Sequence, residues 1–264
     1  MFLKKSLGQN LLIDKNIVKK ILSLTNIKDK NVIEIGPGTG NLTYEILKLN
    51  PKNLLCVEKD KKLSEELKLN LVNTNNNNIK IKNADILSLD LTGLIKKDTV
   101  VLGNLPYNIS TQILIKFLKL NPWSTKLSKI IFMFQKEVGE KIIAKFGNKN
   151  YSRLSIITRS RLKVEDYFYV SKNSFFPKPK IDSIVISFDP IFKKDLNLKS
   201  LDSLEYITRI FFSNKRKMIN KNFKKLKINH DKFIKSNKID LKLRPEQINE
   251  KTYYKIAEYF EKTK

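Results

Sequence analysis

The tetrapeptide at residues 104–107, Asn-Leu-Pro-Tyr, combines groups that could hold a flat ring bearing an exocyclic amine. The side-chain oxygen of Asn104 and the backbone carbonyl of Leu105 or Pro106 can each accept one N–H of such an amine. Pro106 fixes its own φ, and the ring of Tyr107 can stack on the bound ring. An apolar run ending at Leu102 precedes it, so we expect a loop at the carboxyl end of a buried strand, where open α/β sheets bind ligands. Taken alone, the same four residues also suit a plain turn.

A glycine-rich loop lies some seventy residues upstream. An apolar strand at residues 32–35 runs into Gly36, Gly38 and Gly40, and a helical pattern begins at Asn41. Glycines at such a junction let the backbone pass close beneath a ligand. The dinucleotide fingerprint G-x-G-x-x-G is the main alternative, but here the third glycine comes one residue early. The loop therefore indicates a ligand site without a pyrophosphate cradle.

Two acidic residues follow the next two predicted strands. The strand at 53–57 ends in Glu58, at the spacing where an acidic residue meets a ribose in Rossmann-type folds. A third strand at 79–82 leads to Asp85, which could accept from an adenine amino group. Either carboxylate alone also suits a solvated loop. Together with the glycines they predict an adenosine pocket that lacks a phosphate cradle, which favours S-adenosylmethionine.

At this point the chain resembles a known family, the ribosomal RNA adenine N6-dimethyltransferases, over nearly its whole length. The first matching motif reads Ser-Leu-Gly-Gln-Asn-Leu-Leu-Ile-Asp, and a later one reads Phe-Phe-Pro-Lys-Pro-Lys-Ile-Asp-Ser. Any one match could be accidental, whereas eight in order are specific. The eight motifs occupy residues 6–14, 34–40, 57–60, 83–85, 103–110, 135–138, 151–155 and 175–183.

The resemblance implies a Rossmann-like methyltransferase sheet of seven strands, one of them antiparallel. It implies dimethylation of the N6 amines of two adjacent adenines near the 3′ end of 16S rRNA, in small-subunit biogenesis. The target adenine would be held by the loop from Asn104 to Tyr107 and by Phe175, while Phe176 is expected to pack in the core. The residues implied to contact the cofactor are Asn10, Leu12, Gly36, Gly38, Glu58, Asp85 and Asn104.

Two alternatives stay open. The nearest is a resistance-type methyltransferase acting on large-subunit rRNA, although the loop at 36–38 and the segment 9–14 look more like the small-subunit branch. The other is a non-catalytic RNA-binding assembly or transcription factor on the same fold. The intact loop at 104–107, with Glu58 and Asp85, argues against lost catalysis.

Composition indicates a polyanionic partner. The 264 residues include 52 Lys and Arg against 26 Asp and Glu, a formal net charge of +26. Such a surplus favours nucleic acid before membrane. The chain has six arginines among its basic residues, so part of the lysine content is typical of AT-biased coding, but that bias does not explain the deficit of acidic residues. Composition therefore predicts a nucleic-acid partner, and the resemblance implies that this partner is 16S rRNA in the small subunit.

Several classes of site are disfavoured. Cys56 is the single cysteine and His230 the single histidine, so disulfides, zinc clusters and imidazole catalysis are not expected. We expect no metal. No apolar run reaches the length of a membrane span, and the first motif begins within a few residues of the start, so a cytoplasmic protein without a membrane partner is expected. A monomer is the default expectation.

The domain organisation follows from a change of pattern after Asp189-Pro190. Strand-like runs alternate with helical patterns up to that point, which is typical of a doubly wound parallel sheet. We expect a cofactor-binding catalytic domain at 1–190 and a small all-helical RNA-recognition domain at 191–264. In the second, the stretch 213–227 has no acidic residue, which suits RNA contact or a solvated helix face. Its basic residues are Lys215, Arg216, Lys217, Lys221, Lys224, Lys225 and Lys227, and RNA contact is assigned to the first five.

Overall fold

The computed structural model describes residues 10–72, 78–121, 123, 125–192 and 197–264, so residues 6–9 of the first motif lie outside the described part. The chain divides into two compact units. The first, here called the sheet unit, comprises residues 1–139 and 163–190, and the second, the helical unit, comprises 140–162 and 191–264.

The observed units share one boundary with the expected domains, after Pro190, and differ over residues 140–162. These residues contain α6 (Arg153–Arg159), which packs against two C-terminal helices, α7 (Asp202–Phe212) and α10 (Glu250–Thr263). An ion pair of 3.0 Å joins the Arg153 guanidinium to the Glu205 carboxylate, and both side chains are partly buried. Long-range packing of this helix therefore assigns a segment from the middle of the sequence to the helical unit.

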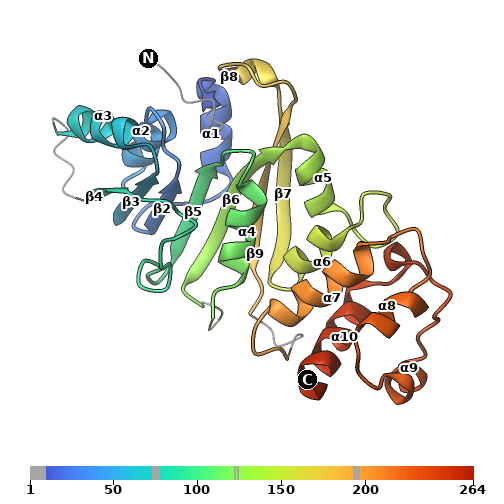
Figure 1. The fold of residues 1–264 in the computed structure, drawn as a ribbon. Coiled ribbons are helices and arrows are strands. Elements are labelled where there is room, and N and C mark those ends of the chain that lie inside the picture. The colour runs from blue at the N-terminus through green and yellow to red at the C-terminus, as the bar shows by residue number, and fades with distance from the viewer. Residues whose placement is uncertain (1–9, 73–77, 122, 124, 193–196) are drawn as a thin grey trace. The chain divides into compact units, whose positions relative to one another are not determined.

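The sheet unit is built on seven strands in the order β4-β3-β2-β5-β6-β9-β7 (Figure 1). Strands β2 to β6 pair in parallel, and β9 runs antiparallel to β6. The predicted mixed sheet is thus confirmed. Its strands are β2 (Asn31–Ile35), β3 (Asn53–Glu58), β4 (Ile79–Asn83), β5 (Thr99–Asn104), β6 (Leu127–Gln135), β7 (Leu162–Val170) and β9 (Ser183–Pro190).

The central strands are continuous apolar runs because helices cover a parallel sheet on both faces. Val32, Val100 and Leu102 are each at most 1% exposed. Aspartates cap the N-termini of two helices. The Asp14 carboxylate accepts from the Asn16 N–H at 2.9 Å at the start of α1, and Asp60 caps α3. The helices are α1 (Lys15–Ser23), α2 (Asn41–Lys48), α3 (Lys61–Leu71), α4 (Ser110–Leu118) and α5 (Lys136–Ile143).

A small antiparallel pair, β1 (Leu11–Leu12) and β8 (Phe175–Phe176), joins the N-terminal segment to a loop far along the chain. Two more hydrogen bonds extend it: the Ile13 N–H donates to the Ser174 carbonyl at 2.9 Å, and the Ser174 hydroxyl donates to the Asp14 carboxylate at 3.1 Å. Strands of two residues leave no periodicity in a sequence, so this pair was not predicted. It fixes the N-terminal segment beside the ends of the sheet strands.

The helical unit has an aromatic core. The ring of Phe211 meets those of Phe223 and Tyr253 edge to face, with centroids 5.2 and 5.6 Å away. Buried Asn222 donates to the Phe211 carbonyl at 2.8 Å and satisfies the end of α7. Two short helices, α8 (Asn220–Lys225) and α9 (Asp231–Ser236), complete the unit with α6, α7 and α10. None of the helices described in either unit is long and apolar enough to cross a membrane.

Candidate active site and nucleic-acid interface

A pocket lies at the carboxyl ends of β2, β3 and β5, where the topology of an open parallel sheet predicts a ligand site. Leu105 and Pro106 contribute to its lining, whereas Tyr107 and Phe175 lie outside it. The structure brings together in this lining all seven residues that the resemblance implied for the cofactor: Asn10, Leu12, Gly36, Gly38, Glu58, Asp85 and Asn104.

The glycine loop forms the floor of the pocket. Gly36 and Gly38 have φ values of 66° and 58°, in the left-handed region that favours glycine. A Cβ added to Gly38 would lie 2.7 Å from Cδ2 of Leu11, so the Leu11 side chain would have to move. A Cβ on Gly36 would approach the Asn104 carbonyl oxygen at 3.8 Å. The absence of side chains at these positions keeps the floor open to a ligand.

Glu58 ends β3 and is 6% exposed. One carboxylate oxygen accepts the Gly38 N–H at 3.2 Å, and the other accepts the Asp60 N–H at 2.8 Å. Burial raises the pKa of the Glu58 carboxyl, and the two backbone donors act in the opposite direction. Since each carboxylate oxygen can accept more than one hydrogen bond, Glu58 can hold the glycine loop and still receive two hydroxyl groups.

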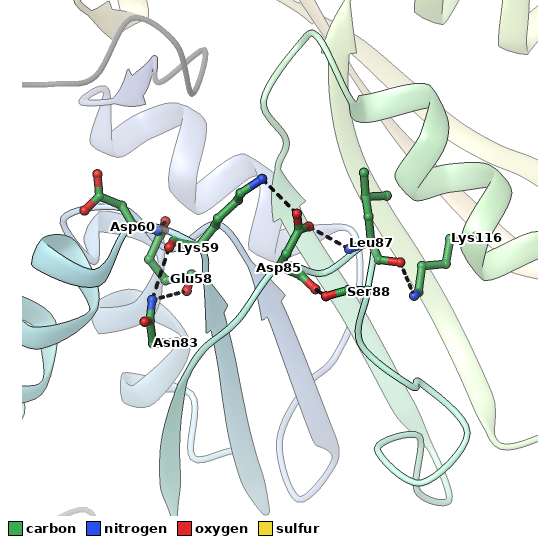
Figure 2. Close-up of polar contacts among 8 residues, drawn as sticks. All are labelled: Glu58, Lys59, Asp60, Asn83, Asp85, Leu87, Ser88 and Lys116. Atoms are coloured by element: carbon green, nitrogen blue, oxygen red, sulfur yellow. Dashed lines mark hydrogen bonds and ion pairs between the residues drawn. The ribbon is translucent and has the colours of Figure 1, made fainter.

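Asp85 lies beside Glu58 in a network of polar contacts (Figure 2). Its carboxylate accepts from Lys59 Nζ at 2.8 Å and from the Leu87 N–H at 2.9 Å, and the Lys59 contact is the main cause of its lowered pKa. The Asn83 side-chain amide donates to the carbonyls of Glu58 and Lys59 at 3.0 and 3.2 Å. Sequence reasoning missed Lys59 and Asn83, because their partners are more than twenty residues away in the sequence.

The loop at 104–107 fixes two polar groups. The Asn104 amide nitrogen donates to the Asn10 carbonyl at 2.8 Å, so the orientation of its side-chain oxygen is set. The Tyr107 hydroxyl and Ser183 Oγ are 2.5 Å apart, and burial raises the pKa of Tyr107. Leu105 is 1% exposed, so its side chain anchors the loop, and the residue also contributes to the lining of the pocket.

The expected core position of Phe176 is wrong, whereas the adenine role of Phe175 stays a prediction. Phe175, expected to face the adenine, is 3% exposed and packs in the core cluster with Leu12 and Val185. Phe176, expected in the core, is 62% exposed. Alternation along β8 places neighbouring side chains on opposite sides, and pairing with β1 decides which one faces inward.

A further acidic residue, Glu34 in β2, lines the pocket and was not singled out from the sequence. It is 1% exposed, and one carboxylate oxygen accepts from the Thr43 hydroxyl at 2.7 Å. The thiol of buried Cys56 donates to the same oxygen at 3.6 Å. Burial raises the pKa of Glu34 to about 7, and the nearby charge of Glu58 contributes in the same direction. The signal available in the sequence for this buried carboxyl was a glutamate within an otherwise apolar strand pattern.

The charges of the lining residues decide which ligand fits. Glu34, Glu58 and Asp85 supply three carboxyl groups. Within the described lining, Lys59 is the single basic residue, and it is paired with Asp85. A polyphosphate would meet no unpaired cation there, whereas a nucleoside carrying a positive charge matches both the acidic groups and the apolar walls. The residues present therefore fit S-adenosylmethionine.

The basic residues predicted to contact RNA are all exposed. They do not form one helix face: Lys215, Arg216 and Lys217 lie in the turn after α7, while Lys221 and Lys224 lie on α8. After this turn the segment passes through Ile219, which is fully buried and anchors the start of α8.

The fold and the pocket together define an α/β methyltransferase that binds a cationic nucleoside. The family model for "Ribosomal RNA adenine dimethylase" matches residues 2–262, and this chain belongs to that family. The family, the enzymatic class and the methyl donor S-adenosylmethionine expected from the sequence are confirmed.

Individual relatives agree with this assignment. The chain is 43% identical to "Ribosomal RNA small subunit methyltransferase A" of Pelagibacter ubique (strain HTCC1062), over 98% of this chain and 97% of the relative. A crystal structure of a dimethyladenosine transferase from Plasmodium falciparum matches with a TM-score of 0.78 at 28% identity, covering 96% of this chain and 98% of the other. The 23S rRNA methyltransferase ErmE shares the fold, with a TM-score of 0.69 at 20% identity, covering 95% and 99% of the two chains.

Proposed function

We propose that this protein dimethylates the N6 amines of two adjacent adenines near the 3′ end of 16S rRNA during small-subunit biogenesis. The observation that carries the proposal is the position of Asn104, whose oriented side-chain oxygen borders the pocket. The small-subunit target is supported by the name of the Pelagibacter ubique relative. ErmE shares the fold at 20% identity and gives no support to the large-subunit alternative.

Positioning is the main task of the protein in this reaction. An adenine N6 amine is a poor nucleophile because its lone pair is delocalised into the ring. S-adenosylmethionine, when bound, supplies a methyl group activated by a sulfonium leaving group. The Asn104 oxygen and the carbonyl of Leu105 or Pro106 accept the two N–H bonds and draw them out of the ring plane, which localises the lone pair. The same carbonyl dipoles face the positive charge that develops on nitrogen, and its proton then leaves to water.

The target base must leave its helix to reach this loop. Tyr107 offers a ring to replace the lost stacking, which contributes about 1–3 kcal/mol per base. Phe175 would supply the second ring if it left the core. In its observed position it supports the strand pair that holds Leu12 at the pocket.

Two variants separate these roles of the phenylalanines. We expect Phe175→Leu to lower turnover more than Phe176→Leu. A loss of turnover with unchanged cofactor affinity would assign Phe175 to the adenine, whereas a parallel loss of cofactor affinity would assign it to support of Leu12. Equal, small effects of the two substitutions would remove both roles.

The two parts of the chain take different roles in this proposal. The sheet unit binds the cofactor and carries the chemistry, and the helical unit recognises RNA through the exposed basic stretch 213–227. The protein acts as a cytoplasmic monomer on the small subunit and has no membrane partner. The net charge of +26 supports a polyanionic substrate.

Transfer of labelled methyl groups from S-adenosylmethionine tests the proposal. The substrates are isolated small subunits, naked 16S rRNA and large-subunit rRNA, and mass spectrometry of the digested RNA separates mono- from dimethyladenosine. We expect dimethyladenosine in small-subunit RNA. Label confined to large-subunit RNA would favour the resistance-type alternative. No label in any RNA, together with retained RNA binding, would favour the non-catalytic factor.

A further inference from the structure

Strand β7 carries two exposed tyrosines at the edge of the sheet. Tyr167 and Tyr169 are two residues apart and so share one face of the strand, where they are 45% and 50% exposed. Their rings meet edge to face with centroids 6.2 Å apart. Phe168 between them points to the other face and packs against the core cluster. The outer face of β7 therefore presents two aromatic rings, at positions where a half-buried strand usually carries polar side chains.

A short series of contacts connects this pair to the proposed adenine loop. Lys136 Nζ lies 5.3 Å from the ring centroid of Tyr169. The Lys136 backbone N–H donates to the Asp182 carbonyl at 3.0 Å. The next residue, Ser183, contacts the Tyr107 hydroxyl through its Oγ. The tyrosine pair thus lies within the same sheet unit as the loop and is connected to it through these contacts.

The charges on this face suit a nucleic acid. Lys163 and Glu165, on the same face of β7, form an ion pair of 2.8 Å and neutralise each other. Lys136 adds a positive charge beside Tyr169. Aromatic rings combined with a cation are the usual means by which proteins bind single-stranded nucleic acid without sequence preference, because every base has a π face.

We propose that Tyr167 and Tyr169, with Lys136, form a stacking surface for the unpaired nucleotides that flank the target adenine. The inference rests on the proposed function, because extruding an adenine into the loop leaves its neighbours unstacked as well. The surface holds those neighbours while the loop at 104–107 holds the reacting base. It acts on RNA affinity and leaves the chemical step unchanged.

Binding of two fluorescein-labelled RNA probes to the full chain tests the surface: a single-stranded octa-adenylate and an eight-base-pair duplex. The double variant Tyr167→Ala/Tyr169→Ala should bind the single strand about five- to a hundredfold more weakly. Its salt dependence should match that of wild type, because stacking releases no counterions. Duplex affinity should be unchanged, since paired bases cannot stack on the rings. The double Phe variant, which keeps both rings, should bind like wild type.

Two further variants complete the test: Lys136→Met probes the cation of the surface, and Phe146→Ala is the control. Lys136→Met should reduce the slope of log affinity against log salt by about 0.7 on the single strand, the value for one phosphate contact. Phe146→Ala removes a ring of similar exposure, 48%, that also meets a neighbour, Tyr151, edge to face, and it should leave single-strand affinity unchanged.

Three results would overturn the surface: wild-type single-strand affinity in the double Ala variant, an equal loss on the duplex, or an equal loss in the Phe146 control. The first result would indicate that the tyrosine pair binds a protein instead of RNA. Failure of the proposed function is a separate result, since it appears as absent methyl transfer by the wild-type protein. Octa-adenylate binding is measured without the cofactor, so the result does not depend on whether methyl transfer occurs.

Discussion

Replacing Glu34 by Gln should change how the stability of the sheet unit depends on pH. Gln keeps an oxygen that can accept from the Thr43 hydroxyl but cannot ionise. Burial raises the pKa of Glu34 from an ordinary 4.5 to about 7, a difference of roughly 2.5 units. At 1.36 kcal/mol per unit, charging this carboxyl in the folded protein costs up to about 3 kcal/mol.

The direction of the effect follows from linkage between protonation and folding. The pKa of Glu34 is higher in the folded than in the unfolded chain, so the folded state binds the proton more tightly. Its contribution to stability is fully present below pH 4.5 and is lost as the pH rises through 7. The Glu34→Gln variant has no ionisable group at this position, so it does not lose this contribution to stability. The free energy of unfolding of Glu34→Gln, minus that of wild type, should therefore grow by up to about 3 kcal/mol between pH 4.5 and 8.

Urea unfolding at pH 4.5, 6, 7 and 8 measures this difference. The single tryptophan, Trp123, belongs to the sheet unit, so its fluorescence follows that unit. Glu45→Gln is a control of opposite sign, because Lys48 lowers the pKa of Glu45. A difference between Glu34→Gln and wild type that stays constant from pH 4.5 to 8 would refute a raised pKa for Glu34.

Three other variants, two single and one triple, test the site and the interface. Asn104→Ala should lower turnover by orders of magnitude with nearly unchanged RNA affinity, and a variant keeping more than about a tenth of wild-type turnover, a loss of roughly 1.4 kcal/mol, would assign the work to another group. Glu58→Ala should instead weaken cofactor binding, measured by calorimetry, because ribose contacts do not change during transfer; unchanged affinity would contradict that role. Neutralising Lys217, Lys221 and Lys224 together should weaken RNA binding and flatten its salt dependence without changing cofactor affinity. Parallel salt slopes for the variant and the wild type would indicate that the basic stretch is only a solvated surface.

The strands and the pocket could be predicted because their signals are local. Each central strand is an apolar run, as at 99–104, and the ends of parallel strands meet at one edge of the sheet. That rule alone brings Glu58 and Asp85 together. The start of α2 at Asn41 followed from the glycine loop before it.

The features that sequence reasoning missed depend on partners far away in the chain. The contact of Lys59 with Asp85 and the buried position of Glu34 are set by neighbouring strands. The exposure of Phe176 depends on pairing with a strand of two residues. Residues 140–162 join the helical unit because α6 packs on helices that follow much later. The contacts of Lys59, Phe176 and α6 leave no periodic pattern in their own segments, whereas the burial of Glu34 had a local signal in the apolar strand around it.

The pairing of β1 with β8 has a consequence for the order of events during synthesis. The strands that carry the glycine loop, Glu58 and Asn104 leave the ribosome in their final sequence order, and each can add to a growing sheet. The segment with Asn10 and Leu12 is made first, yet its strand partner, at 175–176, emerges some 160 residues later. A nascent chain therefore holds most of the pocket but not its N-terminal wall until translation has passed β8. The segment at 10–12 therefore completes the pocket only after most strands of the sheet have been made.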